Sequence, residues 1–373
     1  MISKPFIAGI ACVIIAAPAS VAAQGGYFRT AVIGETYDFA TGLTFDRIRQ
    51  ITIPVGFSIP VGRRTAFAIS SGYTAVQLTS SNGSLDQVTH GPLDTEARLS
   101  VEVIPGRFIL LVTGAAPTGV IVAVDEVAVA GAISSEVIGF SAPALGTGGN
   151  VGGGFVAAVP LGSWALGFGA TYRHPMQYEP IDGLTTQLRP GSEFRIRTGL
   201  EGAVARRTYI RLAAIFARRD KDQIDGVTQN GVGNRIIGYL AVNQGLGNAS
   251  LTVYGLDVFR TDPQIEQTAL GAAVLPRGNL FAAGANLDIP LGASTTITPT
   301  GELRFSARAP DVTTTSIETV GRALRYGLKV KQRLNDAFAL VVGGSLMDGY
   351  VRNAGTRVDM TGFRASLNLE VVP

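Results

Sequence analysis

Charged and apolar side chains alternate along several stretches of this chain, and the charged ones could act together. Glu193, Arg195 and Arg197, for example, alternate with Phe194 and Ile196. If such rows line a pore, their charge sets which ions the pore prefers. The alternative is that the charges pair across neighbouring strands and only hold shape and water. The pattern therefore predicts either selective transport or internal ion pairing.

Residues suited to catalysis or metal binding are sparse. The only histidines are His90 and His174, and no G-x-S-x-G nucleophile motif accompanies them. Asp220, Asp222 and Asp225 depart by one residue from the spacing of a calcium loop, so a solvated loop is the better interpretation. No histidine and cysteine set has the spacing of metal ligands. We therefore predict no enzymatic activity, no cofactor and no metal.

The elements that carry the charged rows are predicted to be β-strands. Side chains of a strand point alternately to opposite faces, which gives the period of two seen here. Helical spacing would scatter the same charges around the helix axis. The period recurs in residues 93–103, 302–308, 324–331 and 362–372.

The spacing of turn residues predicts how many strands there are. About seven short turns rich in Gly, Pro, Asn and Asp alternate with about eight longer polar stretches, which gives about 16 strands, with 14 or 18 as alternatives. A soluble sandwich would not separate its connections by length so regularly. The predicted fold is all-β, a transmembrane antiparallel up-and-down β-barrel with short periplasmic turns and longer extracellular loops. The longer stretches lie near residues 40–44, 80–92, 118–150, 180–191, 220–233, 262–275, 309–317 and 351–359.

The first 23 residues are predicted to be a cleaved signal peptide. They form an apolar run after Lys4 and end in small residues, with cleavage expected before Gln24. A single membrane anchor is the alternative, but it needs about 20 apolar residues and no cleavage site. The only cysteine, Cys12, lies in this segment, so no disulfide is expected. Residues 24–373 would form one barrel domain with 30 basic and 28 acidic residues, a balance that predicts no binding of nucleic acid.

Alternation also assigns residues to the inside of the barrel. The wet face of the strands collects mostly arginine, which favours anionic or small organic solutes. The candidate pore-lining residues are Arg98, Arg173, Arg195, Arg197, Arg211, Arg304, Arg308, Arg325, Lys329, Arg364, Glu96, Glu193 and Glu302.

The pattern as a whole resembles Gram-negative outer-membrane β-barrels. "AAPTG" (115–119), "ALGTGGNVGGG" (144–154) and "WALGFGATYR" (164–173) together resemble the transporter-like barrels of the FadL and phenol-pathway type. Those barrels carry a strand ending in Pro-Thr-Gly, a long loop, a Gly-Thr-Gly turn and a strand ending in Gly-x-x-Tyr-Arg. The chain departs from them in lacking an Asn-Pro-Ala hatch motif, and it ends in Pro373 where such barrels usually end in an aromatic residue.

The stretch 118–150 is too apolar for a free surface loop. It could form an extra hairpin, a short helix or a segment folded into the lumen, and unstructured loops of this length are often functional. In general porins, which the chain also resembles, the third long loop folds inward and narrows the pore. Asp125, Glu126 and Glu136 are therefore candidate constriction residues that would face arginines of the lumen.

These patterns predict a channel in the bacterial outer membrane, reached after signal-directed export, for passive uptake of small solutes. A structural or adhesive barrel without an open pore is the alternative, and an outer-membrane hydrolase is a third hypothesis. The expected partners are outer-membrane lipid, lipopolysaccharide, the barrel-assembly machinery and a small solute. Monomer and trimer both remain open, because a wall that faces protein resembles a wall that faces lipid in composition.

Overall fold

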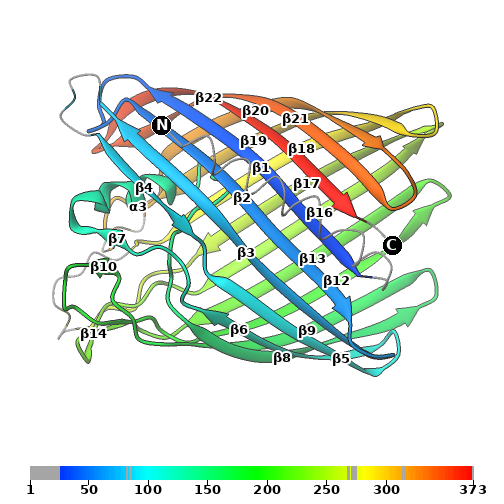
Figure 1. Ribbon diagram of the computed structural model, residues 1–373, viewed down its shortest axis with the longest axis horizontal. Helices are drawn as coiled ribbons and strands as arrows, with labels where there is room; N and C mark the ends of the chain where they lie inside the picture. The colour runs from blue at the N-terminus through cyan, green and yellow to red at the C-terminus, as the bar shows by residue number, and fades with distance from the viewer. Residues whose placement is uncertain are drawn as a thin grey trace.

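A computed structural model describes residues 26–371, apart from gaps at 81–82, 84–85, 267–268, 270–274, 313 and 315. The predicted signal peptide, residues 1–23, lies outside the described residues. The described chain forms an antiparallel sheet whose first and last strands, β1 and β22, pair and close it into a barrel (Figure 1). The predicted fold class is confirmed.

The barrel wall has 16 strand positions, because β4 and β5 both pair with β3 and together occupy one position. A break at Leu93 and Asp94 separates these two segments. The wall strands are β1 (Tyr27–Phe39), β2 (Arg47–Pro60), β3 (Thr65–Thr79), β4 (Gln87–Pro92), β5 (Thr95–Ile104), β6 (Phe108–Ala116), β8 (Asn150–Leu161), β9 (Trp164–Pro175), β12 (Glu193–Ala205), β13 (Thr208–Arg219), β16 (Arg235–Leu246), β17 (Ala249–Arg260), β18 (Gly278–Leu291), β19 (Thr295–Arg308), β20 (Glu318–Arg333), β21 (Phe338–Asn353) and β22 (Thr356–Val371).

The two ends of the barrel differ in the length of their connections. At the short-turn end, where β1 begins and β22 ends, the turns span two to four residues. At the opposite, long-connection end they reach the length of residues 117–149. One predicted long connection, 351–359, is wrong: the strands continue to a tight turn at Ala354 and Gly355. Both turn residues have positive φ (47° and 83°), as in a type I′ hairpin turn.

The outer face of the wall is apolar. Phe363 and Leu367 of β22 are 46% and 49% exposed, and their cross-strand neighbours Leu346 and Val342 on β21 are equally exposed. A row of exposed apolar side chains on one face suits contact with hydrocarbon, and closure of the barrel leaves no unpaired sheet edge there. Among the described residues, no helix is long and apolar enough to span a bilayer.

Residues 117–149, here called the plug, fold into the barrel at its long-connection end. They contain β7 (Val122–Ala123), the short 3-10 helix η1 (Val124–Glu126) and α3 (Val127–Ile133), seen at that end in Figure 1. Val129 and Ile133 of α3 are fully buried and belong to the hydrophobic core. Wall residues complete this core from the inside: Tyr37, Phe39, Ile48, Val76, Leu78, Ala323, Met347, Val358 and Met360.

Further short strands join the long connections to one another. β10 (Ile181–Asp182) pairs with β7 of the plug. β11 (Leu188–Arg189), β14 (Gln223–Ile224) and β15 (Val227–Thr228) form a small separate sheet. The connections after β9 and β13 therefore fold together at the long-connection end of the barrel instead of extending freely.

Candidate functional site

The strand register places the predicted pore-lining residues on one face of the wall. Directly paired residues share a face, and Arg98 pairs with Thr113 while Arg173 pairs with Glu193. That face is the inner one, because Arg325 and Arg364 on the same face contact the plug. By register and alternation the inner face carries all thirteen candidates: Arg98, Arg173, Arg195, Arg197, Arg211, Arg304, Arg308, Arg325, Lys329, Arg364, Glu96, Glu193 and Glu302.

Several of these residues surround a cavity of about 890 Å³ inside the wall, here called the basic chamber. Its lining comes from nine neighbouring positions of the wall, from β22 through β1 to β12. Arg29, which the sequence analysis did not select, also lines it. The charged residues of the lining are Arg29, Arg98, Arg173, Arg195, Arg197 and Glu96.

The basic chamber holds more positive charge than its ion pairs neutralise. Glu193, at its edge, pairs with Arg195 and, at 2.7 Å, with Arg235. The guanidinium groups of Arg98, Arg173 and Arg197 form no hydrogen bond or ion pair with another residue that the structure describes. Cross-strand pairing therefore accounts for part of the lumenal charge and leaves a cluster of guanidinium groups open to the cavity.

A second group of arginines holds residues 136–139 of the plug, here called its tip. Arg260 of β17 forms an ion pair with Glu136 at 2.7 Å. Arg325 of β20 donates to the carbonyl oxygen of Ile138, and Arg364 of β22 donates to that of Gly139, both at 2.7 Å. The tip is therefore bound by side chains from distant parts of the wall. These three contacts show that the plug crosses the interior of the barrel.

Gly139 is required at this point by its backbone and by its surroundings. Its φ is +63°, a conformation that L side chains rarely adopt, and a β-carbon there would collide with the guanidinium group of Arg304. The close approach lets the plug backbone reach the arginines of the wall.

Beside the tip, a buried carboxylate links the plug to the seam between β1 and β22. Glu35 of β1 is hydrogen-bonded to Arg364 and accepts from the backbone N–H of Ser141 at 2.8 Å. Gln50 of β2 donates to the carbonyl oxygen of Ala142 at 2.8 Å. The sequence analysis did not select Glu35 or Gln50, because the alternation of β1 is masked by Tyr37 and other apolar inner residues.

One carboxylate binds both ends of the plug, near Gly119 and near Thr147. Asp94, at the break between β4 and β5, accepts hydrogen bonds from the backbone N–H of Gly119 at 2.8 Å and of Thr147 at 2.7 Å. The Thr147 hydroxyl donates to the same carboxylate at 2.8 Å. Nearby, Tyr178 lies against Gly148; burial raises the pKa of this tyrosine, and the charge of Asp94 acts in the same direction. Asp94 thus joins both ends of the plug to the wall.

The three predicted constriction residues have different surroundings. Glu136 contacts an inner arginine, Arg260. Glu126 accepts a hydrogen bond from Thr89 of β4 at 2.7 Å, and the carbonyl oxygen of Asp125 accepts one from Gln87. The latter two therefore lie where the plug meets β4, and Glu136 alone of the three is placed among the inner arginines.

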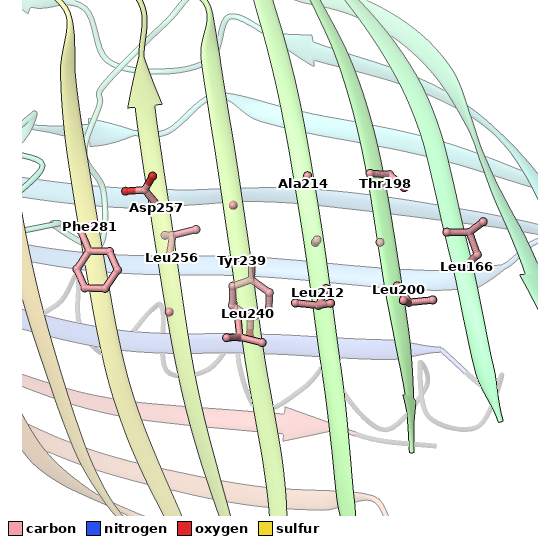
Figure 2. Close-up of a pocket in the computed structure, with 14 residues that line it drawn as sticks. Leu166, Thr198, Leu200, Leu212, Ala214, Tyr239, Leu240, Leu256, Asp257 and Phe281 are labelled. Carbon is pink, nitrogen blue, oxygen red and sulfur yellow. The ribbon is translucent and has the colours of Figure 1, made fainter. Parts of the chain in front are cut away.

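The outer wall carries a separate apolar pocket of about 580 Å³, shown in Figure 2. Leu212 and Leu240, which are exposed on the outer face, line it together with Leu200, the cross-strand partner of Leu212. Asp257 is also in its lining and pairs across strands with the exposed Phe281. None of the thirteen pore-lining candidates lines this pocket, so it is not part of the lumenal site.

Both histidines have a hydroxyl partner. His174 Nδ1 lies 3.0 Å from Ser192 Oγ, and His90 Nδ1 lies 3.0 Å from the hydroxyl of Tyr73. A serine hydrolase also needs a group that orients the histidine. Within the described residues, no carboxylate is hydrogen-bonded to the ring of His174. The structure therefore supplies a Ser–His contact without the third member.

Two of the three aspartates after β13 serve the local fold. Asp222 pairs with Arg219 at 2.8 Å and accepts from the backbone of Gly191, and Asp225 accepts from that of Gln187. Among the residues described, no group of three or more histidine, cysteine or acidic side chains is arranged to hold a metal ion.

Comparison with known proteins supports the fold. Neither a protein-family model nor a curated protein matches the chain. Among solved structures, a bacterial polysaccharide outer membrane secretin superposes with a TM-score of 0.50 and 9% identity, over 94% of this chain and 99% of that chain. Pseudomonas aeruginosa OpdQ gives a TM-score of 0.46 with 9% identity, over 92% of this chain and 97% of that chain. A mutant of the TodX monoaromatic hydrocarbon channel gives 0.46 with 9% identity, over 97% of this chain and 94% of that chain.

The chain has the fold of outer-membrane β-barrel proteins. At this level of identity the likeness concerns the fold alone, and function has to be argued from the site.

Proposed function

We propose that the chain is an outer-membrane channel for passive uptake of small anionic solutes. The observation that carries this proposal is the basic chamber, in which five arginines and one glutamate line a cavity of about 890 Å³ inside the barrel. A wall of one charge within a low-dielectric surround raises the local concentration of ions of opposite charge. Small anions, including organic ones, are therefore the solute class that the lumen favours.

The outer face and the two ends of the barrel support the proposed placement in the membrane. The apolar outer wall would lie in hydrocarbon, with the short turns in the periplasm and the long connections outside the cell. Residues 1–23 would direct export, and lipopolysaccharide and the barrel-assembly machinery would be the partners at the membrane. The plug would then lie on the extracellular side of the basic chamber, where solutes enter. The proposal assigns no enzymatic activity.

A planar bilayer containing the folded mature chain tests the proposal. Under a salt gradient, the reversal potential should show anion preference, and Arg98→Gln with Arg197→Gln should reduce it. The control is Arg218→Gln, because Arg218 pairs with Phe194 and so lies on the outer face of the same wall. An unchanged reversal potential in the double variant, or cation preference in the unmodified chain, would contradict the proposal.

A closed structural barrel is the second candidate, and the apolar packing of the plug favours it. Val129, Ile133 and Ile138 of the plug are buried against the inner wall, so the long-connection end is filled in this state. Deleting residues 120–142 distinguishes the channel from the closed structural barrel. A channel should conduct more after the deletion, whereas a barrel that stays silent with its fold intact would support the structural role.

A further inference from the structure

A polar recess of about 170 Å³ adjoins the plug on the inner wall formed by β17–β22. Its charged lining consists of Arg325, Lys329 and Arg364 together with Glu302. The recess is distinct from the basic chamber, because the two share no lining residue. Gly343 leaves space in it: a β-carbon there would lie 3.0 Å from Ser366 Oγ and 3.5 Å from Lys329 Cγ.

The recess carries positive charge that its own residues do not neutralise. Glu302 accepts hydrogen bonds from Arg304 at 2.8 Å and from Tyr254 at 2.7 Å and forms an ion pair with Arg325 at 3.8 Å, so one carboxylate is shared among several partners. Glu35 is likewise engaged with Arg364. The ammonium group of Lys329 forms no hydrogen bond or ion pair with any other described residue. It is therefore available, in the same recess as the guanidinium groups of Arg325 and Arg364, to an ion of opposite charge.

We propose that this recess binds a small oxyanion, a phosphate or carboxylate group, through Lys329, Arg325 and Arg364, and that the bound anion loosens the plug. The inference rests on the proposed function, because it names a binding step for the anionic solutes of the channel. The volume suits a small solute or the charged end of a larger one.

The coupling to the plug follows from what the two arginines hold. Arg325 and Arg364 each donate to a neutral backbone carbonyl oxygen of the plug, at Ile138 and Gly139. An oxyanion offers a guanidinium group Coulombic attraction and a bidentate geometry that a neutral carbonyl oxygen does not offer. An oxyanion beside Lys329 competes with the two carbonyl oxygens for the same donors. By thermodynamic linkage, the recess must then bind the anion more tightly when the plug is displaced than when the plug is seated.

Isothermal titration calorimetry with inorganic phosphate tests the site on the folded mature chain in detergent. Lys329→Gln should weaken binding about tenfold or more, since a charged hydrogen bond is lost. Lys331→Gln is the matched control: Lys331 lies two residues further along the same face of β20, is paired with Glu370 at 3.0 Å and does not line the recess. Equal phosphate affinity in the Lys329 variant and the unmodified chain would overturn the site.

A cysteine reporter tests the coupling, because the only native cysteine is Cys12. Val137, in the plug, is 5% exposed, so Val137→Cys should react slowly with a thiol reagent and several-fold faster when phosphate is bound. Val124→Cys, at a plug position that is 56% exposed, should react quickly with or without phosphate. Phosphate binding that leaves the labelling rate at position 137 unchanged would overturn the coupling.

The titration needs no open channel, so the two proposals fail separately. A chain that conducts anions selectively but binds no phosphate would refute the recess and leave the proposed channel standing. A chain that binds phosphate through Lys329 but never conducts would support the recess and refute the channel.

Discussion

Replacing Asp94 should free the plug while leaving the barrel wall intact. Its carboxylate accepts three hydrogen bonds, from Gly119 and Thr147 at the two ends of the plug. Asp94→Ala removes all three acceptor contacts at once. Asp94→Asn keeps one carbonyl oxygen as an acceptor and should have an intermediate effect.

The magnitude follows from the three bonds. A hydrogen bond to a charged group contributes about 1.5–3 kcal/mol where it is shielded from water, as the partly buried bond from Gly119 is. The two bonds from Thr147 are exposed and add little, so the total for the three is about 2–3 kcal/mol. A change of that size raises the ratio of displaced to seated plug by about 30- to 150-fold. The barrel itself keeps its register, because residues on either side of Asp94 remain paired with β3.

Single-channel recording measures the effect as the fraction of time spent in the more conducting state. Hydrogen exchange provides a second readout, in which the amides of residues 120–146 should lose protection. Glu96→Gln is the matched control, because Glu96 lies two residues along the chain and lines the basic chamber without a contact to the plug. If Asp94→Ala gave the same single-channel recordings and the same hydrogen-exchange protection as the unmodified chain, Asp94 would not hold the plug in place.

Three further predictions concern the plug tip and the outer face. Arg364→Leu leaves Glu35 buried without its cation, so the free energy of unfolding in detergent should fall by about 3–5 kcal/mol. Adding Glu35→Gln should recover most of this loss. An unchanged unfolding midpoint in the single variant would contradict the pairing. Gly139→Ala forces a side chain against Arg304 at φ +63°, so plug amides should exchange faster while β-sheet circular dichroism stays the same. Phe363→Arg places a charge on the outer face, and the folding free energy in lipid vesicles should fall by about 2–4 kcal/mol if that position is near the membrane midplane; equal stability would place the position outside hydrocarbon.

The wall was predictable from the sequence because one physical rule governs most of it. Where the lumen is wet and the outside is apolar, side chains alternate with period two, and the row from Glu193 to Arg197 fell within β12 as expected. Turn residues such as Gly, Pro, Asn and Asp marked most of the connections. The exceptions are the second half of 80–92, which forms β4, and 351–359. In 351–359 the polar residues belong to strands that extend beyond their neighbours, which local composition does not distinguish from a loop.

The seat of the plug could not be predicted in the same way. Tyr37, Phe39 and Ile48 face inward at the long-connection end, where the rule expects polar residues. They are apolar because α3 and its neighbours in the plug, not water, lie against them. Because of these apolar inner residues, β1 shows no clear alternation of polar and apolar residues, and Glu35 could not be recognised as an inner residue. Contacts such as Arg325 with Ile138 depend on a backbone carbonyl oxygen, which carries no signature in the sequence.

The plug also spans the junction at which the barrel closes. Its core partners include Tyr37 and Ile48 near the beginning of the chain and Val358 and Met360 near the end. Arg364 and Glu35 connect the same two strands, β22 and β1, directly beneath it. The complete seat exists only once the final strand has paired with the first. Full docking of the plug therefore requires a closed barrel, and the contacts of the docked plug with both strands oppose their separation along this seam.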